Sequence, residues 1–72
     1  MKNEIEIEVD TLTQFIAGFM YGNYDQVLIE FSTGKRVKAV DMSLSVLDGI
    51  KVKFIKGVYF DLDTEMYIIE VE

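Results

Sequence analysis

The chain contains no cysteine, no histidine and no proline. Without cysteine it forms no disulfide and no thiolate metal site, and without histidine it lacks the commonest metal ligand and general base. No apolar run approaches the roughly 20 residues that a membrane-spanning helix needs. Only Asp, Glu, Lys, Ser and Tyr remain for chemistry, and no carboxylate pair stands out by its spacing. We therefore expect no metal, no cofactor and no enzymatic activity.

The composition is that of one small folded domain. Half of the 72 residues are hydrophobic, which suffices for one core and leaves no room for a second, so we predict a single domain over residues 1–72. The polar, acidic start MKNEIEIEVD lacks the apolar centre of a secretion signal. The expected location is therefore the cytoplasm.

Charge is arranged in three blocks along the chain. Residues 1–34 carry six acids and one base, residues 35–56 carry six bases and two acids, and residues 57–72 carry five acids and no base. The balances are −5, +4 and −5, which sum to the net charge of −6. The blocks either neutralise one another in cross-strand pairs or leave an acidic face for a basic partner.

Hydrophobic periodicity predicts one helix near the N-terminus. The alternation NEIEIEV indicates a first strand, and Thr11 with Gln14 then forms a capping box that starts a helix of about three turns. Gly22-Asn23 is a typical helix stop. An apolar stripe is expected to pack on a sheet, and its members are Leu12, Phe15, Ile16, Phe19 and Met20.

The rest of the chain is typical of strands joined by tight turns. QVLIEFSTGKRVKAV predicts a hairpin that turns at Thr33-Gly34, and SLSVLDGIKVKFI predicts another around Asp48-Gly49, a frequent type I′ pair. Near Asp41 the apolar, core-facing side chains change from odd-numbered to even-numbered positions, which predicts a bulge or bend there. After Gly57 we expect an extra short strand at Val58–Phe60, an acidic turn at DLDTE and a closing strand at MYIIEVE.

These elements together predict an α+β fold. One short helix packs on a mostly antiparallel sheet of four to six strands, in the order β-α-β-β-β-β, because nearly all the connections are tight. In the second hairpin the inward side chains are expected to be Met42, Leu44 and Val46.

The outward face of the predicted helix is the first candidate binding surface. It carries no charge, whereas a solvated helix face normally carries Lys or Glu. A glycine in the middle of a helix costs about 1 kcal/mol relative to alanine, and close approach of another backbone is one reason to keep it. We therefore predict that this face forms a homodimer or docks on another protein, through Thr13, Gln14, Ala17, Gly18 and Tyr21.

The acidic residues form the second candidate surface. Alternate strand residues lie about 7 Å apart on one face, close to the phosphate spacing of a DNA strand. A ladder of Glu4, Glu6 and Glu8, joined by Asp61, Asp63 and Glu65, is therefore consistent with a DNA mimic that inhibits a nucleic-acid-binding protein. The simpler interpretation of the last three acids is a solvated turn, not a cation site.

A third candidate surface is basic. Lysines on the middle strands, with Tyr59 or Phe60 for stacking, are consistent with binding of nucleic acid or of a small anionic ligand, although the net charge of −6 opposes direct nucleic-acid binding. The basic residues are Lys35, Arg36, Lys38, Lys51, Lys53 and Lys56. The leading expectation remains a small acidic protein-interaction module, self-associating, that binds and inhibits a larger protein.

Overall fold

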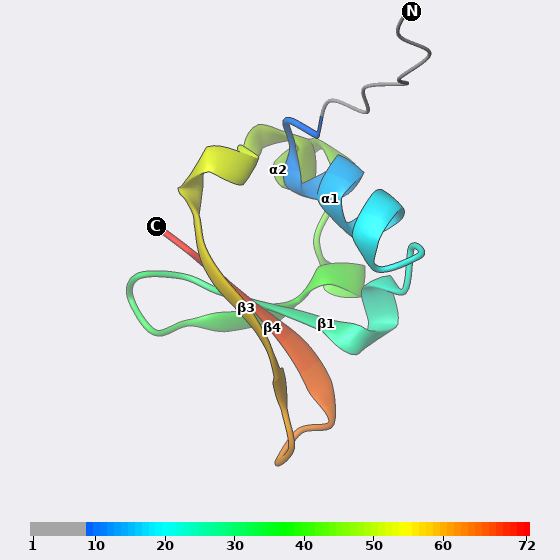
Figure 1. Ribbon diagram of the computed structural model, residues 1–72. Helices are drawn as coiled ribbons and strands as arrows, with labels where there is room; N and C mark the ends of the chain where they lie inside the picture. Colours follow the sequence, from blue (N-terminus) through cyan, green and yellow to red (C-terminus); the bar gives the residue numbers. More distant parts are fainter. Residues whose placement is uncertain (1–8) are drawn as a thin grey trace, which may run out of the picture.

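The computed structural model describes residues 9–72, so residues 3–8 of the predicted first strand, including Glu4, Glu6 and Glu8, lie outside the described residues. In the described part of the chain, helices and strands alternate in a single compact unit (Figure 1). In chain order the elements are α1 (Leu12–Phe19), the 3-10 turn η1 (Tyr24–Gln26), β1 (Val27–Glu30), β2 (Arg36–Lys38), the 3-10 turn η2 (Ala39–Asp41), α2 (Leu44–Gly49), the 3-10 turn η3 (Val52–Phe54), β3 (Ile55–Asp61) and β4 (Met66–Val71).

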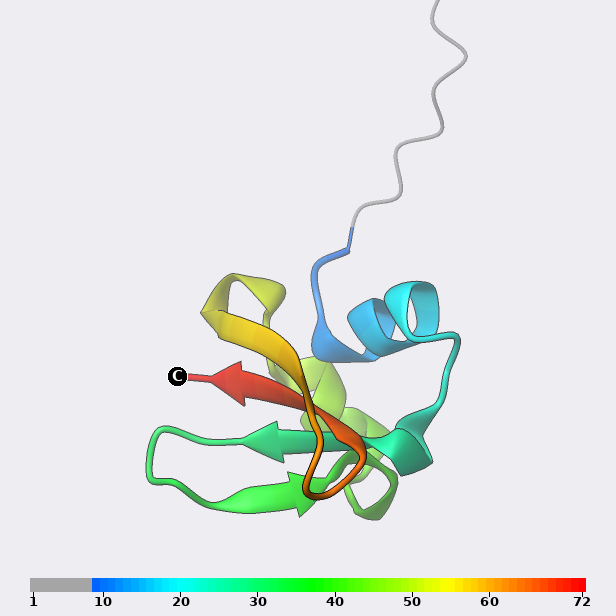
Figure 2. The same ribbon diagram turned by 60° about the horizontal axis from the view of Figure 1, so that its bottom comes forward.

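The four described strands form one sheet in the order β2-β1-β4-β3 (Figure 2). The two outer pairings, β1 with β2 and β3 with β4, are antiparallel, whereas β1 and β4 pair in parallel at the centre. The predicted α+β class and mostly antiparallel sheet are confirmed. The sheet thus consists of two antiparallel hairpins joined along a parallel seam.

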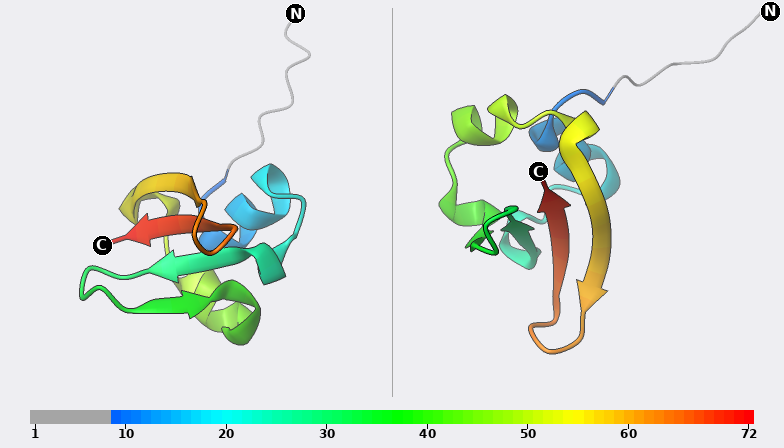
Figure 3. Two further views of the ribbon diagram at one scale, coloured as in Figure 1. Left: turned by 90° about the horizontal axis from the view of Figure 1, so that it is seen from below. Right: turned by 90° about the vertical axis from the view of Figure 1, so that its left-hand side faces the viewer.

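The hydrophobic core lies between the sheet and the two helices. Seen from the side opposite the helices, the strands lie in front and both helices behind them (Figure 3). Because strand side chains alternate between faces, Val27 and Ile29 of β1 share the helix-covered face with Ile69 and Val71 of β4. The fully buried members of this cluster are Leu12, Ile16, Val27, Ile29, Ala39, Leu47, Ile69 and Val71.

The start of α1 follows the predicted capping box. The Thr11 Oγ1 atom accepts a hydrogen bond from the Gln14 backbone N–H at 3.3 Å, and the Gln14 side chain accepts one from the Thr11 N–H at 3.1 Å. The helix ends earlier than expected, after eight residues and about two turns. Gly22, at a φ of 72°, donates its N–H to the Ile16 carbonyl and closes the end, as predicted.

The first predicted hairpin is confirmed by β1 and β2. Gly34 adopts a φ of 89° in the turn and donates its N–H to the Phe31 carbonyl at 2.8 Å. Glu30 lies opposite Arg36 in the register, and the two side chains form an ion pair at 3.4 Å. Here an acid of the first charge block is paired with a base of the middle block, as cross-strand neutralisation predicts.

The second predicted hairpin is wrong, because residues 44–49 form helix α2. The Ser43 side chain accepts a hydrogen bond from the Val46 N–H and caps the helix, a signal that outweighs the Asp48-Gly49 turn pattern. Helical periodicity turns Leu47 into the core and leaves Leu44 and Val46 exposed, the reverse of the strand expectation. The parity switch near Asp41 is produced by the 3-10 turn η2 rather than by a bulge.

Replacing Gly49 with alanine distinguishes the helix from the hairpin. Gly49 lacks a positive φ and has open space where a Cβ atom would lie, so alanine fits and we expect the free energy of unfolding to rise by about 0.5 kcal/mol. Urea denaturation of the two proteins measures this difference. A type I′ turn needs a positive φ at this position, so a clear loss of stability would contradict helix α2.

The second half of the sheet is formed by β3, the acidic turn and β4. The short strand expected at Val58–Phe60 is the middle of the longer β3, and Gly57 marks a register shift against β4 instead of ending the strand. A Cβ atom at Gly57 would lie 3.1 Å from a Glu70 side-chain oxygen, so a larger residue there requires the Glu70 side chain to shift. The predicted acidic turn and closing strand are confirmed.

Candidate functional site: an apolar groove beside helix α1

The hairpin of β3 and β4 extends past the two helices, so its far end has no helix over it (Figures 1 and 3). Val58 and Phe60 of β3 and Tyr67 of β4 lie on the helix-facing side of the sheet but remain about two-fifths exposed. The Phe60 and Tyr67 rings meet edge to face, with their centroids 5.0 Å apart. This end of the sheet therefore presents aromatic surface that the described residues leave uncovered.

The C-terminal end of α1 borders the same region. Phe19 was predicted to pack in the core, and this is wrong, because 65% of its surface is exposed. The two-turn helix buries Leu12 and Ile16, and its last turn has no sheet beneath it to cover Phe19. The Phe19 ring instead stacks on Phe15 at a centroid distance of 5.1 Å. The apolar stripe therefore runs from the core to the surface.

Tyr21 follows in an unusual backbone conformation. Its φ is 55°, in the left-handed region that costs a bulky residue roughly 1 kcal/mol, and its side chain is 88% exposed. A strained backbone that holds an aromatic ring in solvent contributes nothing to the described core. Tyr21 directly follows the C-cap residue Met20, a position at which helices commonly end in the left-handed conformation.

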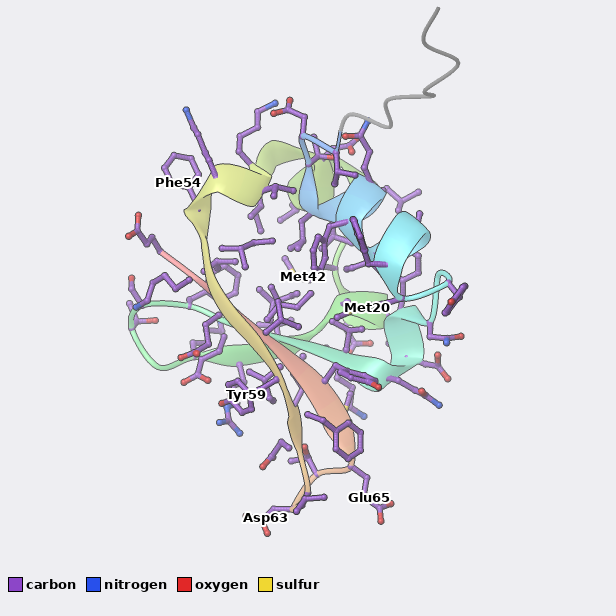
Figure 4. All side chains as sticks on the ribbon, viewed as in Figure 1. Met20, Met42, Phe54, Tyr59, Asp63 and Glu65 are labelled. Carbon is purple, nitrogen blue, oxygen red and sulfur yellow. The ribbon has the colours of Figure 1, made fainter. Side chains whose placement is uncertain are left out.

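Between the helix end and the strands lies a groove of about 360 Å³. Met20, labelled in Figure 4, projects between α1 and the strands and lies along the wall of this groove. The groove is mostly apolar, with two amide side chains at its edge, and is lined by Phe15, Phe19, Met20, Tyr21, Asn23, Gln26, Val27, Val58 and Tyr67. It has the size and apolar character of a site that accepts a few large side chains.

The charge near the groove has one sign. The stretches 12–30 and 57–72, which supply every lining residue, contain no Lys or Arg. Asp25 lies in the sequence between the lining residues Asn23 and Gln26 and is exposed, and Asp63 and Glu65 project from the turn at the tip of the β3–β4 hairpin (Figure 4). The two segments that line the groove therefore carry acids and no base, and the nearest base in the sequence is Lys56, two residues before Val58.

The predicted neutral helix face is only partly available. Gln14 is occupied by the capping box, and the Thr13 Oγ1 atom is buried with no hydrogen-bond partner among the described residues. Ala17, Gly18 and Tyr21 are exposed, and a Cβ atom at Gly18 would have no described neighbour within 4 Å. No contact of the described chain therefore explains Gly18, and Phe19 lies beside it at the surface.

The acidic turn is held by local hydrogen bonds. Asp61 accepts a hydrogen bond from the Thr64 hydroxyl at 2.8 Å, and this bond lowers the pKa of the Asp61 carboxyl below its ordinary value. No group of three or more carboxylates in residues 9–72 is arranged to hold a metal ion. Asp61 faces the side of the sheet opposite the groove.

The basic residues are divided between opposite edges of the sheet. Arg36 and Lys38 belong to β2 at one edge, whereas Lys56 belongs to β3 at the other. Lys51 forms an ion pair with Asp10 at 3.1 Å, and Lys53 lies over the Phe54 ring. The bases of the described chain do not form the single stripe that the nucleic-acid alternative requires.

Tyr59 is also engaged within the chain. It lies on the sheet face opposite the groove, and its hydroxyl donates to the Glu30 carboxylate at 3.5 Å, beside Arg36. Burial first, and then the Glu30 charge, raise the pKa of the Tyr59 hydroxyl. The residue remains 40% exposed on that face.

Comparisons with protein-family models, with curated proteins and with solved structures found no match. In the described part of the chain, the helices are too short to cross a membrane. The sequence interpretation missed the groove because it assigned Phe19 to the core. The available signal was the run Val58-Tyr59-Phe60, which places apolar side chains on both faces of a strand and so leaves one set without a core to fill.

Proposed function

We propose that this protein is a small acidic, non-enzymatic interaction module that binds a larger protein and modulates its activity. The observation that carries the proposal is the apolar groove between the end of α1 and the β3–β4 hairpin. Exposed aromatic residues gathered at one site on a small protein are the usual anchors of a protein interface.

The exposed rings supply the binding energy in this proposal. Burying apolar surface contributes about 25 cal/mol per Å², so covering Phe19, Tyr21 and Tyr67 together supports a measurable affinity. Other large apolar side chains of the described residues are also exposed, Leu62 and Leu44 among them, but they do not line the groove. Self-association through Ala17, Gly18 and Tyr21 stays a prediction, because this surface continues into the groove.

Charge substitution at Phe19 tests the proposal. Phe19→Asp places a carboxylate at the groove, whereas Leu44→Asp places one on α2, and the two native side chains are equally exposed at 65% and 63%. Both variants are expected to fold like the wild type, as circular dichroism will show. We expect Phe19→Asp to weaken binding to the purified partner by about 30-fold and Leu44→Asp to change it little.

The partner is first identified by capture on immobilised wild-type protein and on both variants, followed by mass spectrometry. A specific partner is retained by the wild type and by Leu44→Asp and is lost from Phe19→Asp. Equal retention on all three surfaces, repeated in titrations with the purified partner, would show that the groove is not the binding site.

A further inference from the structure

We propose that the groove takes an apolar segment of a partner protein that is flanked by lysine or arginine residues. This inference rests on the proposed function and adds the chemical class of the partner. It follows from the distribution of charge around the groove, which is independent of the apolar lining itself.

Every base of the described residues lies between Lys35 and Lys56, and the groove is built from the segments before and after this block. Asp25 lies in the sequence between the lining residues Asn23 and Gln26, and Asp63 and Glu65 lie in the hairpin turn that leads into β4 and Tyr67. None of these three carboxylates is paired with a Lys or Arg among the described residues. Their charge is therefore available to a ligand within a Debye length of about 8 Å.

The native ion pairs lie elsewhere. Arg36 neutralises Glu30 at the opposite edge and on the opposite face of the sheet, and Lys51 neutralises Asp10 before α1. Asp25, Asp63 and Glu65 are thus among the described acids that form no ion pair with a described Lys or Arg. A basic flank on either side of an apolar segment complements this arrangement, steering the encounter while the rings supply the affinity.

A second copy of the chain is a poorer occupant. In a two-fold pairing the same surface meets itself, so Asp25, Asp63 and Glu65 of each copy would approach their counterparts. Like charges brought together at an interface are unfavourable, and the net charge of −6 adds to the repulsion. The charge pattern therefore favours a foreign segment.

Three labelled peptides test the inference with the full-length protein. Each has a Leu-Phe-Leu centre, and the flanks are paired lysines, paired glutamines or paired glutamates. Fluorescence anisotropy is expected to show the lysine peptide binding about tenfold more tightly than the glutamine peptide at about 50 mM salt. The preference should shrink to less than about twofold at 500 mM salt, where the Debye length is only about 4 Å.

Charge-reversal variants test whether acids near the groove cause the preference for lysine flanks. Each of the single variants Asp25→Lys and Asp63→Lys is expected to weaken the preference for lysine flanks, while Glu72→Lys, which changes the net charge by the same amount, serves as the matched control. Glu72 is exposed and lies at the far end of β4 from Tyr67, so the control changes the net charge but not the groove. Phe19→Asp is expected to weaken all three peptides.

The outcomes separate this inference from the proposed function. If the three peptides bound equally, or if Glu72→Lys had the same effect as the groove variants, the inference that the partner segment has basic flanks would be wrong. The proposal that the groove binds a protein would still stand. Peptide binding that ignores Phe19→Asp would place the peptide elsewhere and also overturn the inference. A wild-type dimer in sedimentation equilibrium that Phe19→Asp dissociates would make a second copy the occupant.

Discussion

Replacement of Leu47 by alanine will lower the free energy of unfolding by about 3 kcal/mol. Leu47 is the buried residue of α2 and packs in the core with the residues of α1, β1 and β4. A domain of this length has a total stability of about 4–11 kcal/mol, so the loss is a large fraction of it. The midpoint of thermal unfolding, measured by circular dichroism, is expected to fall by about 15 °C.

Val46→Ala is the matched control for this experiment. Val46 is adjacent in the sequence but half exposed on α2, so we expect its truncation to cost less than about 0.5 kcal/mol. A strand at this position would bury Val46 and expose Leu47. A larger loss for Val46→Ala than for Leu47→Ala would therefore mean that residues 44–49 are not helical.

Ile16→Ala will also destabilise the protein by about 3 kcal/mol, whereas Phe19→Ala will cost less than about 1 kcal/mol. Ile16 is fully buried under α1, and Phe19, one turn later, is mostly exposed and contacts Phe15. The larger side chain is thus expected to contribute less to folding. Urea denaturation with a common m-value measures both losses.

The second half of this comparison concerns binding. Phe19→Ala removes an anchor of the groove, so the partner affinity should fall although the stability hardly changes. Ile16→Ala should lower the stability but leave the partner affinity nearly unchanged, when the affinity is measured at a temperature where the variant is still folded. If Phe19→Ala destabilised the fold as strongly as Ile16→Ala, Phe19 would belong to the core and the groove would not exist as described.

Local signals predicted those parts of the fold that local hydrogen bonds determine. The capping box of Thr11 and Gln14 and the glycine turn at Gly34 each involve near neighbours in the chain, and each was correct. Residues 44–49 were predicted wrongly because a short apolar stretch fits both periods. The hydrogen bond from the Val46 N–H to the Ser43 side chain stabilises the helix there, whereas the frequent occurrence of Asp-Gly in hairpins favoured the wrong prediction.

The candidate site was less accessible to sequence analysis. Whether Phe19 is buried depends on where the sheet ends beneath α1, and this is set by strands from the other end of the chain. The exposed residues Ala17, Gly18 and Tyr21 were selected for their lack of charge, which is a local property. The groove beside them also needs Val58 and Tyr67, and no spacing in the sequence connects these residues to the helix.

The parallel seam between β1 and β4 has a consequence for the order of folding. Each hairpin closes over a short loop and can form early, whereas the seam joins residues that are 40 positions apart in the chain, such as Val27 and Tyr67. Ile69 and Val71 reach the core only when this seam closes, so neither hairpin is stable alone. The docking of the two hairpins is therefore expected to be the rate-limiting step. During synthesis on a ribosome, the core must stay open to solvent until the last strand has emerged.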